Sequence, residues 1–132
     1  METRTRSSAV TNGIRVEVQS QFLPQQSYPA GQRFVFAYRV RIINEGKRAV
    51  QLVTRHWIVT HADGHVEEVH GAGVVGEQPT LQPGQGFEYT SGCILRTPRG
   101  TMQGTYRIVD ESGESFDAAI GRFLLEMPFS LN

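Results

Sequence analysis

The sequence predicts an all-β protein whose strands form an immunoglobulin-type antiparallel sandwich of about seven strands. Apolar and polar residues alternate with a period of two along most of the chain, which is typical of strands with one buried face. Turn-forming residues separate these segments at short intervals. No segment keeps a helical period for more than one or two turns. A small closed barrel needs similar strand patterns and is the alternative fold.

Seven segments carry the strand pattern. They are residues 13–19, 34–42, 50–61, 66–70, 87–91, 101–110 and 115–125. The second has the clearest alternation, because Phe34, Phe36, Tyr38, Val40 and Ile42 share one face and arginines dominate the other. Burial of a large apolar side chain contributes roughly 1.5–3 kcal/mol, so this strand is expected to be a main source of stability.

Two glycine-containing turns predict hairpins. Asp63 and Gly64 are expected to form a two-residue turn, since both of its positions need a positive φ. Ser112 and Gly113 mark the second hairpin. Tyr106 opens the penultimate strand, where an immunoglobulin-type sandwich places a buried tyrosine. We expect its hydroxyl to donate to a main-chain carbonyl in the preceding loop.

Length and composition predict a single globular domain. The 132 residues carry 13 Lys and Arg against 13 Asp and Glu, which excludes the strongly basic type of nucleic-acid-binding protein. One cysteine allows no internal disulfide. Without a signal-peptide core or a membrane-length apolar stretch, we expect a cytoplasmic protein with no membrane insertion. The predicted organisation is a flexible N-terminal arm over 1–12, the domain over 13–127 and a tail over 128–132.

Four histidines within fifteen residues, His56, His61, His65 and His70, suggest a metal site. With a two-residue turn, His61 and His70 would share one face of the hairpin at about 13 Å, and His56 and His65 the other at roughly 20 Å. Ligands of one metal ion lie about 3–4 Å apart. The spacing predicts no metal site without a ligand from another strand, and we expect surface histidines, with His70 packed on Trp57.

A G-x-G-x-x-G pattern lies at Gly71, Gly73 and Gly76. This spacing binds a pyrophosphate when a helix follows it, but Val74 and Val75 are β-branched and a proline comes soon after. A glycine-rich connection between the sheets is therefore favoured. Backbone amides of such a loop could still hold an anion. Exposed valines at the loop tip support a third interpretation, a protein contact site.

Other chemically interesting residues predict no catalytic site. Cys93 would need a neighbouring base, and the nearest histidine in sequence, His70, is far away, so a buried thiol is expected. Asp110, Glu111 and Glu114 cluster at a hairpin turn, where carboxylates are solvated rather than tuned for acid–base work.

The order and spacing of several motifs are specific. The run R-H-W-I-V-T over 55–60 and a D-G turn lead into G-x-G-V-V-G-E-Q-P over 71–79. L-x-P-G-x-x-F-x-Y-x-S-G-C over 81–93 and T-P-x-G-x-M-x-G-x-Y over 97–106 follow. Together these motifs closely resemble the bacterial ApaG family, also named CorD, over about residues 13–125.

The resemblance implies a fibronectin type III-like β-sandwich and links the chain to cobalt resistance and magnesium efflux. The same domain occurs in eukaryotic F-box proteins and in a DNA-polymerase-delta-interacting protein, where it resembles a protein-interaction module. The glycine pattern of the family, discussed as a pyrophosphate site, falls here on Gly71, Gly73 and Gly76.

We therefore expect a non-enzymatic protein-interaction or regulatory domain with an unidentified protein partner and no cofactor or metal. The expected contact loop, supported by Trp57 from the adjacent strand, consists of Gly71, Gly73, Val74, Val75, Gly76, Glu77, Gln78 and Pro79. The alternative is a protein that binds phosphate, pyrophosphate or a nucleotide on the amides of residues 71–76. Direct binding of Co²⁺ or Mg²⁺ would have only Glu67, Glu68 and the turn 110–114 to draw on. The oligomeric state stays open.

Overall fold

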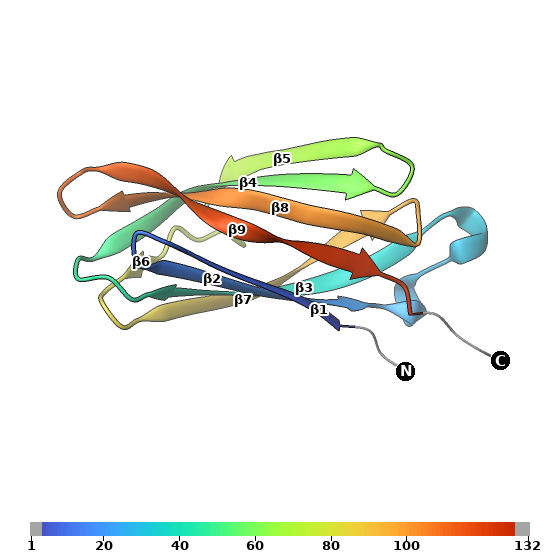
Figure 1. Ribbon diagram of the computed structural model, residues 1–132, viewed down its shortest axis with the longest axis horizontal. Helices are drawn as coiled ribbons and strands as arrows, with labels where there is room; N and C mark the ends of the chain where they lie inside the picture. Colours follow the sequence, from blue (N-terminus) through green and yellow to red (C-terminus); the bar gives the residue numbers. More distant parts are fainter. Residues whose placement is uncertain (1–3, 129–132) are drawn as a thin grey trace.

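Two antiparallel sheets packed face to face make up the computed structural model over the residues that it describes, 4–128 (Figure 1). The first sheet has the order β1 (Arg4–Thr11), β2 (Ile14–Phe22), β3 (Phe34–Asn44) and β7 (Gly86–Leu95). The second has the order β5 (Val66–Ala72), β4 (Val50–His61), β8 (Arg99–Asp110) and β9 (Ser115–Glu126), and β6 (Thr80–Leu81) also pairs with β4. The short 3-10 turns η1 (Pro24–Gln26) and η2 (Pro29–Gly31) connect β2 to β3. The predicted all-β sandwich is confirmed, and the closed barrel is not the fold.

The predicted flexible arm over residues 1–12 is wrong for residues 4–11, which form β1 and pair with β2 along their whole length. Asn12 and Gly13 connect the two strands with φ values of 47° and 80°. Positive φ at both positions is the geometry of a two-residue hairpin turn, and Asn-Gly is its strongest sequence signal. The remaining predicted terminal residues, 1–3 and 129–132, lie outside the described part of the chain.

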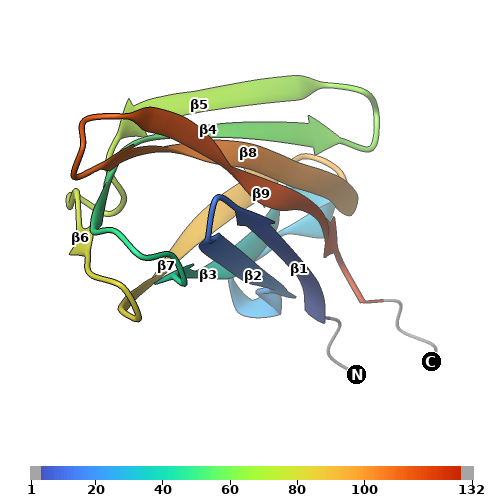
Figure 2. The ribbon, with the colours of Figure 1, turned by 60° about the vertical axis from the view of Figure 1, so that its left-hand side comes forward.

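The strand β1 closes one flank of the sandwich, because it lies beside β9 of the other sheet (Figure 2). The Ala119 amide of β9 donates to the Thr11 hydroxyl of β1 at 3.0 Å. The Ser20 hydroxyl of the neighbouring β2 donates to the Leu124 carbonyl of β9 at 2.8 Å. The opposite flank has β7 and β5 as its edge strands. No helix among the described residues has the length and apolarity needed to span a bilayer.

Trp57 of β4 lies at the centre of the core, with 2% of its surface exposed. The centroid of its ring lies 5.2 Å from the ring centroid of Tyr38, 6.2 Å from that of Tyr106 and 6.0 Å from that of Phe123. The apolar face predicted for residues 34–42 is confirmed, since all five of its large side chains are buried. The core thus joins the inner faces of both sheets through aromatic contacts.

A β-bulge in β4 determines which of its side chains reach this core. Leu52 pairs with Ile108 of β8, whereas Thr54 pairs with Arg107, so Val53 is an extra residue in β4. An extra residue reverses the alternation of the side chains that follow it. Residue 52 is therefore buried before the bulge, and the odd-numbered Trp57 is buried after it.

Tyr106 is fully buried, as predicted, but its expected partner is wrong. Its hydroxyl pairs with the hydroxyl of Tyr89 from β7, not with a main-chain carbonyl. Burial raises the pKa of both phenols well above the ordinary value, so the pair is uncharged at neutral pH. This hydrogen bond connects the two sheets beside Trp57.

Tyr89→Phe is expected to lower the free energy of unfolding by about 1–3 kcal/mol, because it leaves the buried Tyr106 hydroxyl without its partner. The double variant Tyr89→Phe/Tyr106→Phe should be more stable than Tyr89→Phe alone, since neither ring then carries a hydroxyl. Urea denaturation of the wild type, both single variants and the double variant measures the coupling. Strictly additive losses would contradict a direct bond between the hydroxyls.

Candidate functional site

The glycine-rich segment after β5 forms a tight, hydrogen-bonded turn rather than a helix start. The Val74 amide donates to the Glu77 carbonyl at 2.8 Å, and the Glu77 amide donates back to the Val74 carbonyl at 2.9 Å. Val75 and Gly76, the two central residues, have φ values of 48° and 79°. This is the two-residue turn with positive φ at both positions that normally joins β-strands.

The glycines of this segment have structural roles. At Gly73, where φ is 60°, a Cβ atom would lie 2.1 Å from the Glu77 carbonyl oxygen. At Gly71 a Cβ would lie 2.6 Å from a guanidinium nitrogen of Arg55. The amide of Gly73 donates to a carbonyl of β4, and the Val74 and Glu77 amides close the turn. Three amides that a pyrophosphate could have used are therefore already engaged.

Arg55 of β4 is a loop-supporting residue that the sequence interpretation missed. Its Nη1 donates to the Ala72 carbonyl at 3.1 Å and to the Gly73 carbonyl at 2.9 Å. These bonds hold the end of β5 against β4 at the point where the turn begins. An arginine among alternating strand residues looks like a surface charge, so the sequence carries no signal for this role.

The two valines of the turn have opposite environments. Val74 is fully buried in the core, so the prediction that it is exposed at the loop tip is wrong. Val75 is 64% exposed, as predicted. A β-branched residue with a positive φ is an outlier, and the left-handed conformation costs roughly 1–2 kcal/mol. The turn therefore holds an apolar side chain in solvent in a strained backbone conformation.

The other residues of the predicted contact loop are either exposed to solvent or hydrogen-bonded to β4. Gly76, Glu77 and Gln78 are exposed, and the Gln78 side chain donates to the Val53 carbonyl at 2.8 Å. The Pro79 carbonyl accepts the Leu52 amide at 3.0 Å. Trp57 lies in the core and offers no exposed surface to a partner, so its predicted supporting role is limited to packing.

The hairpin of β4 and β5 has a three-residue turn, Ala62–Gly64, so the predicted two-residue turn is wrong. The His61 amide donates to the His65 carbonyl at 2.8 Å, and the Gly64 amide donates to the His61 carbonyl at 3.0 Å. Gly64 alone in this turn has a positive φ, 91°. A turn of this kind, ending in a left-handed glycine, is the usual three-residue hairpin connection. The longer turn shifts every cross-strand pair by one residue.

This shift brings together histidines that the predicted register separated. His56 and His70 are direct cross-strand partners, and their rings stack at 4.0 Å with an interplanar angle of 11°. Glu68, two residues before His70 on the same face, places a carboxylate oxygen 2.9 Å from His56 Nε2. The prediction that His61 shares a face with His70, and His56 with His65, is therefore wrong, as is the packing of His70 on Trp57.

A second cluster lies on the opposite face near the turn. The His61 and His65 rings lie 5.1 Å apart, and Glu67 lies 3.2 Å from His61 Nε2 and 3.4 Å from His65 Nε2. His61 is buried, and its Nδ1 accepts the Arg96 amide at 3.2 Å. Because that amide can only donate, the ring proton of neutral His61 is on Nε2, where it donates to Glu67.

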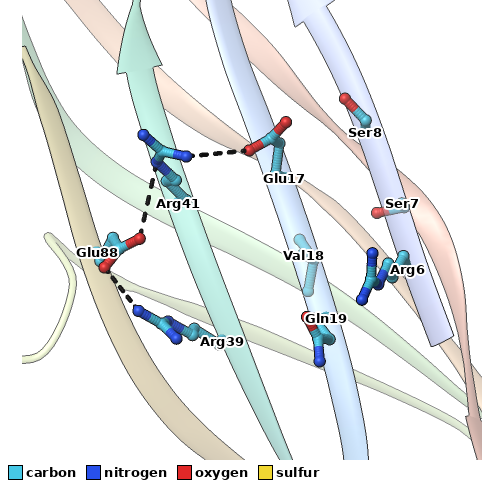
Figure 3. A pocket seen from close by; sticks show the side chains of 9 residues that line it. All are labelled: Arg6, Ser7, Ser8, Glu17, Val18, Gln19, Arg39, Arg41 and Glu88. Atoms are coloured by element: carbon cyan, nitrogen blue, oxygen red, sulfur yellow. Dashed lines mark hydrogen bonds and ion pairs between the residues drawn. The ribbon is translucent and has the colours of Figure 1, made fainter. Parts of the chain in front are cut away.

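The outer face of the first sheet holds a hollow of about 520 Å³ lined by arginines and glutamates (Figure 3). Arg39 lies 2.9 Å from Glu88, and Arg41 bridges Glu88 at 3.7 Å and Glu17 at 4.0 Å. Arg6 of β1 lines the same hollow. All four bridging side chains are largely exposed, and such pairs contribute about 0–1 kcal/mol each. This face is a solvated ion-pair network, and the loop and the histidine clusters are the better candidate sites.

Comparisons with known proteins agree with this architecture. A family model described as the ApaG domain matches residues 24–110. Protein ApaG of Anaeromyxobacter dehalogenans is 56% identical over 126 residues, which cover 96% of this chain and 99% of that protein. Protein ApaG of Rhodospirillum centenum is 58% identical over 121 residues, or 92% of this chain and 93% of that protein.

The solved structures agree as well. An ApaA protein from Bordetella pertussis superposes with a TM-score of 0.86 at 52% identity, covering 89% of this chain and 95% of that one. The match extends over both sheets, and the family-model match spans the turn and the two histidine clusters. The chain therefore belongs to the ApaG family.

Proposed function

We propose that this chain is a non-enzymatic protein-interaction domain that contacts its partner through the turn with Val75 at its tip. The observation that carries the proposal is the combination of strain and exposure at this residue. Val75 has a φ of 48° and is 64% exposed, although glycine or asparagine would fit the turn at lower cost. Strain of this kind at an exposed position supports a functional role for the side chain.

The surroundings of the turn favour a rigid contact. The Val74 side chain is anchored in the core, and two backbone hydrogen bonds close the turn. Hydrogen bonds from Arg55 to Gly73 and from Gln78 to Val53 tie both ends of the turn to β4. A preformed tip loses little conformational entropy on binding, so a small apolar contact can contribute to affinity.

A non-enzymatic role is supported by the environments of the most reactive groups. Burial raises the pKa of the Cys93 thiol to about 12, which keeps it protonated at neutral pH. The Asp110 carboxylate accepts the Ser112 amide at 2.8 Å and the Glu114 amide at 3.1 Å. Hydrogen bonding to Ser112 lowers the pKa of Asp110, so this carboxylate is an ionised turn anchor.

We extend the proposal to the cellular role that the family resemblance implies. The partner would be a protein that regulates cobalt resistance and magnesium efflux, and the contact would be made in the cytoplasm. The alternative function, phosphate or pyrophosphate binding by the loop amides, has less support. The amides of Gly73, Val74 and Glu77 already donate within the chain.

Val75→Asn and Val75→Gly are expected to raise the free energy of unfolding by about 1 kcal/mol, because either residue adopts a positive φ with less strain. The same variants should weaken partner binding at least about tenfold, since they remove the apolar side chain. Urea denaturation measures the first effect. Photo-crosslinking from position 75 in lysate, with competition by purified protein, measures the second.

Val10→Asn is the matched control, because Val10 is a 50% exposed valine on β1. A supporting result is a protein crosslinked from position 75 but not from position 10, and competed by the wild type and Val10→Asn but not by Val75→Asn. Competition by Val75→Asn at the strength of the wild type would contradict the proposal. The same conclusion would follow if Val75→Asn destabilised the fold.

Cys93 in the native protein is expected to react with a disulfide reagent about a thousandfold more slowly than an ordinary cysteine at pH 8. A thiol with a pKa of about 12 is ionised in about one molecule in 10⁴ at this pH, against about one in four for a pKa near 8.5. Stopped-flow absorbance measures the rate, and unfolding in urea should restore it. A native rate equal to the unfolded rate would reveal an activated thiol and reopen the question of an enzymatic function.

A further inference from the structure

The outward face of the hairpin formed by β4 and β5 holds the most suggestive cluster of metal-ligating groups outside the turn. His56, Glu68 and His70 each offer one ligand atom, and these three atoms lie within 4.8 Å of one another. We propose that they form a binding site for a divalent transition-metal ion. The site shares no residue with the proposed contact turn at Val75, so the failure of either proposal can be distinguished from the failure of the other.

The backbone register brings the two imidazoles close together. Starting from the bond between the His61 amide and the His65 carbonyl, hydrogen-bonded and non-hydrogen-bonded pairs alternate along the hairpin. His56 and His70 fall on a non-hydrogen-bonded pair, in which the side chains are closest. His56 lies on β4, which is paired on both sides with β5 and β8, and His70 lies on the edge strand β5, which β4 holds in register.

The donor set selects the class of ion. Two imidazole nitrogens and one carboxylate oxygen suit Zn²⁺, Ni²⁺ or Cu²⁺, whereas Mg²⁺ and Ca²⁺ prefer oxygen ligands alone. Glu68 Oε1 is already 2.9 Å from His56 Nε2, about the distance between ligands on one ion. The His70 ligand nitrogen lies within 4.8 Å of the other two ligand atoms, and its ring must turn out of the stacked arrangement to bind the same ion.

The site has room for the ion and for further ligands. The His56 side chain is 32% exposed and the Glu68 side chain is 55% exposed. Both histidines line a surface hollow of about 410 Å³, together with Thr105 and Arg107. Three protein ligands and an open side toward this hollow leave one or more coordination positions for water.

The second cluster does not offer the same chemistry. A metal-bound histidine donates its other ring N–H to a neighbouring acceptor. His61 cannot do so, because its Nδ1 faces the Arg96 amide, which is itself a donor. The Nε2 atom that points to Glu67 therefore carries the proton of the neutral ring. This leaves His65 and Glu67 as the available groups, one fewer than in the first cluster.

The test is a calorimetric titration of the full chain with Zn²⁺, combined with NMR of the histidine ring nitrogens. The expected result is one tight equivalent per chain, with metal-dependent shifts in the rings of His56 and His70. His56→Gln and His70→Gln should each weaken this binding at least about tenfold, and Glu68→Gln should weaken it to a smaller extent. Thermal unfolding without metal checks that the exposed substitutions leave the fold intact.

His65→Gln is the matched control, since it removes an exposed histidine of the same hairpin from the other cluster. It should leave the tight equivalent unchanged. The proposal is overturned if Zn²⁺ does not bind, if His70→Gln binds it as tightly as the wild type, or if His65→Gln abolishes binding. An unchanged affinity in Glu68→Gln would remove the carboxylate from the proposed ligand set.

Discussion

The β-bulge at Val53 is the constraint on which both candidate sites depend. One extra residue in β4 reverses the alternation of the rest of the strand. Without it, Trp57 would point to solvent and His56 into the core, which would remove the aromatic centre of the sandwich and bury an imidazole. The bulge therefore places the largest core residue inside and the first histidine of the proposed metal site outside.

The same bulge anchors the strained turn. The carbonyl of Val53 accepts the Gly73 amide at 2.8 Å and the Gln78 side chain at 2.8 Å, one bond on each side of the turn. A bulged residue is displaced from the regular ladder with β8, and here its carbonyl holds the loop beyond β5. Together with the burial of Val74, these bonds keep Val75 in a conformation that a free loop would leave.

The alternation of polar and apolar residues predicts the sandwich and the buried face of residues 34–42, and the position of Tyr106 in an immunoglobulin-type strand predicts its burial. The alternation does not predict features that depend on one extra residue, such as the length of a turn or the position of a bulge. A three-residue turn in place of a two-residue turn moved each histidine to a different partner. The pattern of apolar residues does not predict the bulge at Val53. The strand β1 closes a flank of the sandwich but is polar, so its sequence predicts a flexible arm instead of a strand.

The proposed metal site and the turn at Val75 are close along the chain, so binding at one can affect binding at the other. His70 lies near the C-terminal end of β5, and residues 71–73 connect it directly to the turn at Val75. An ion held between His56 and His70 would fix the end of β5 against β4, where Arg55 already binds two carbonyls. A partner that requires the ordered turn would then bind more tightly to the metal-loaded chain. Because coupling between two sites is reciprocal, the partner would strengthen metal binding by the same factor.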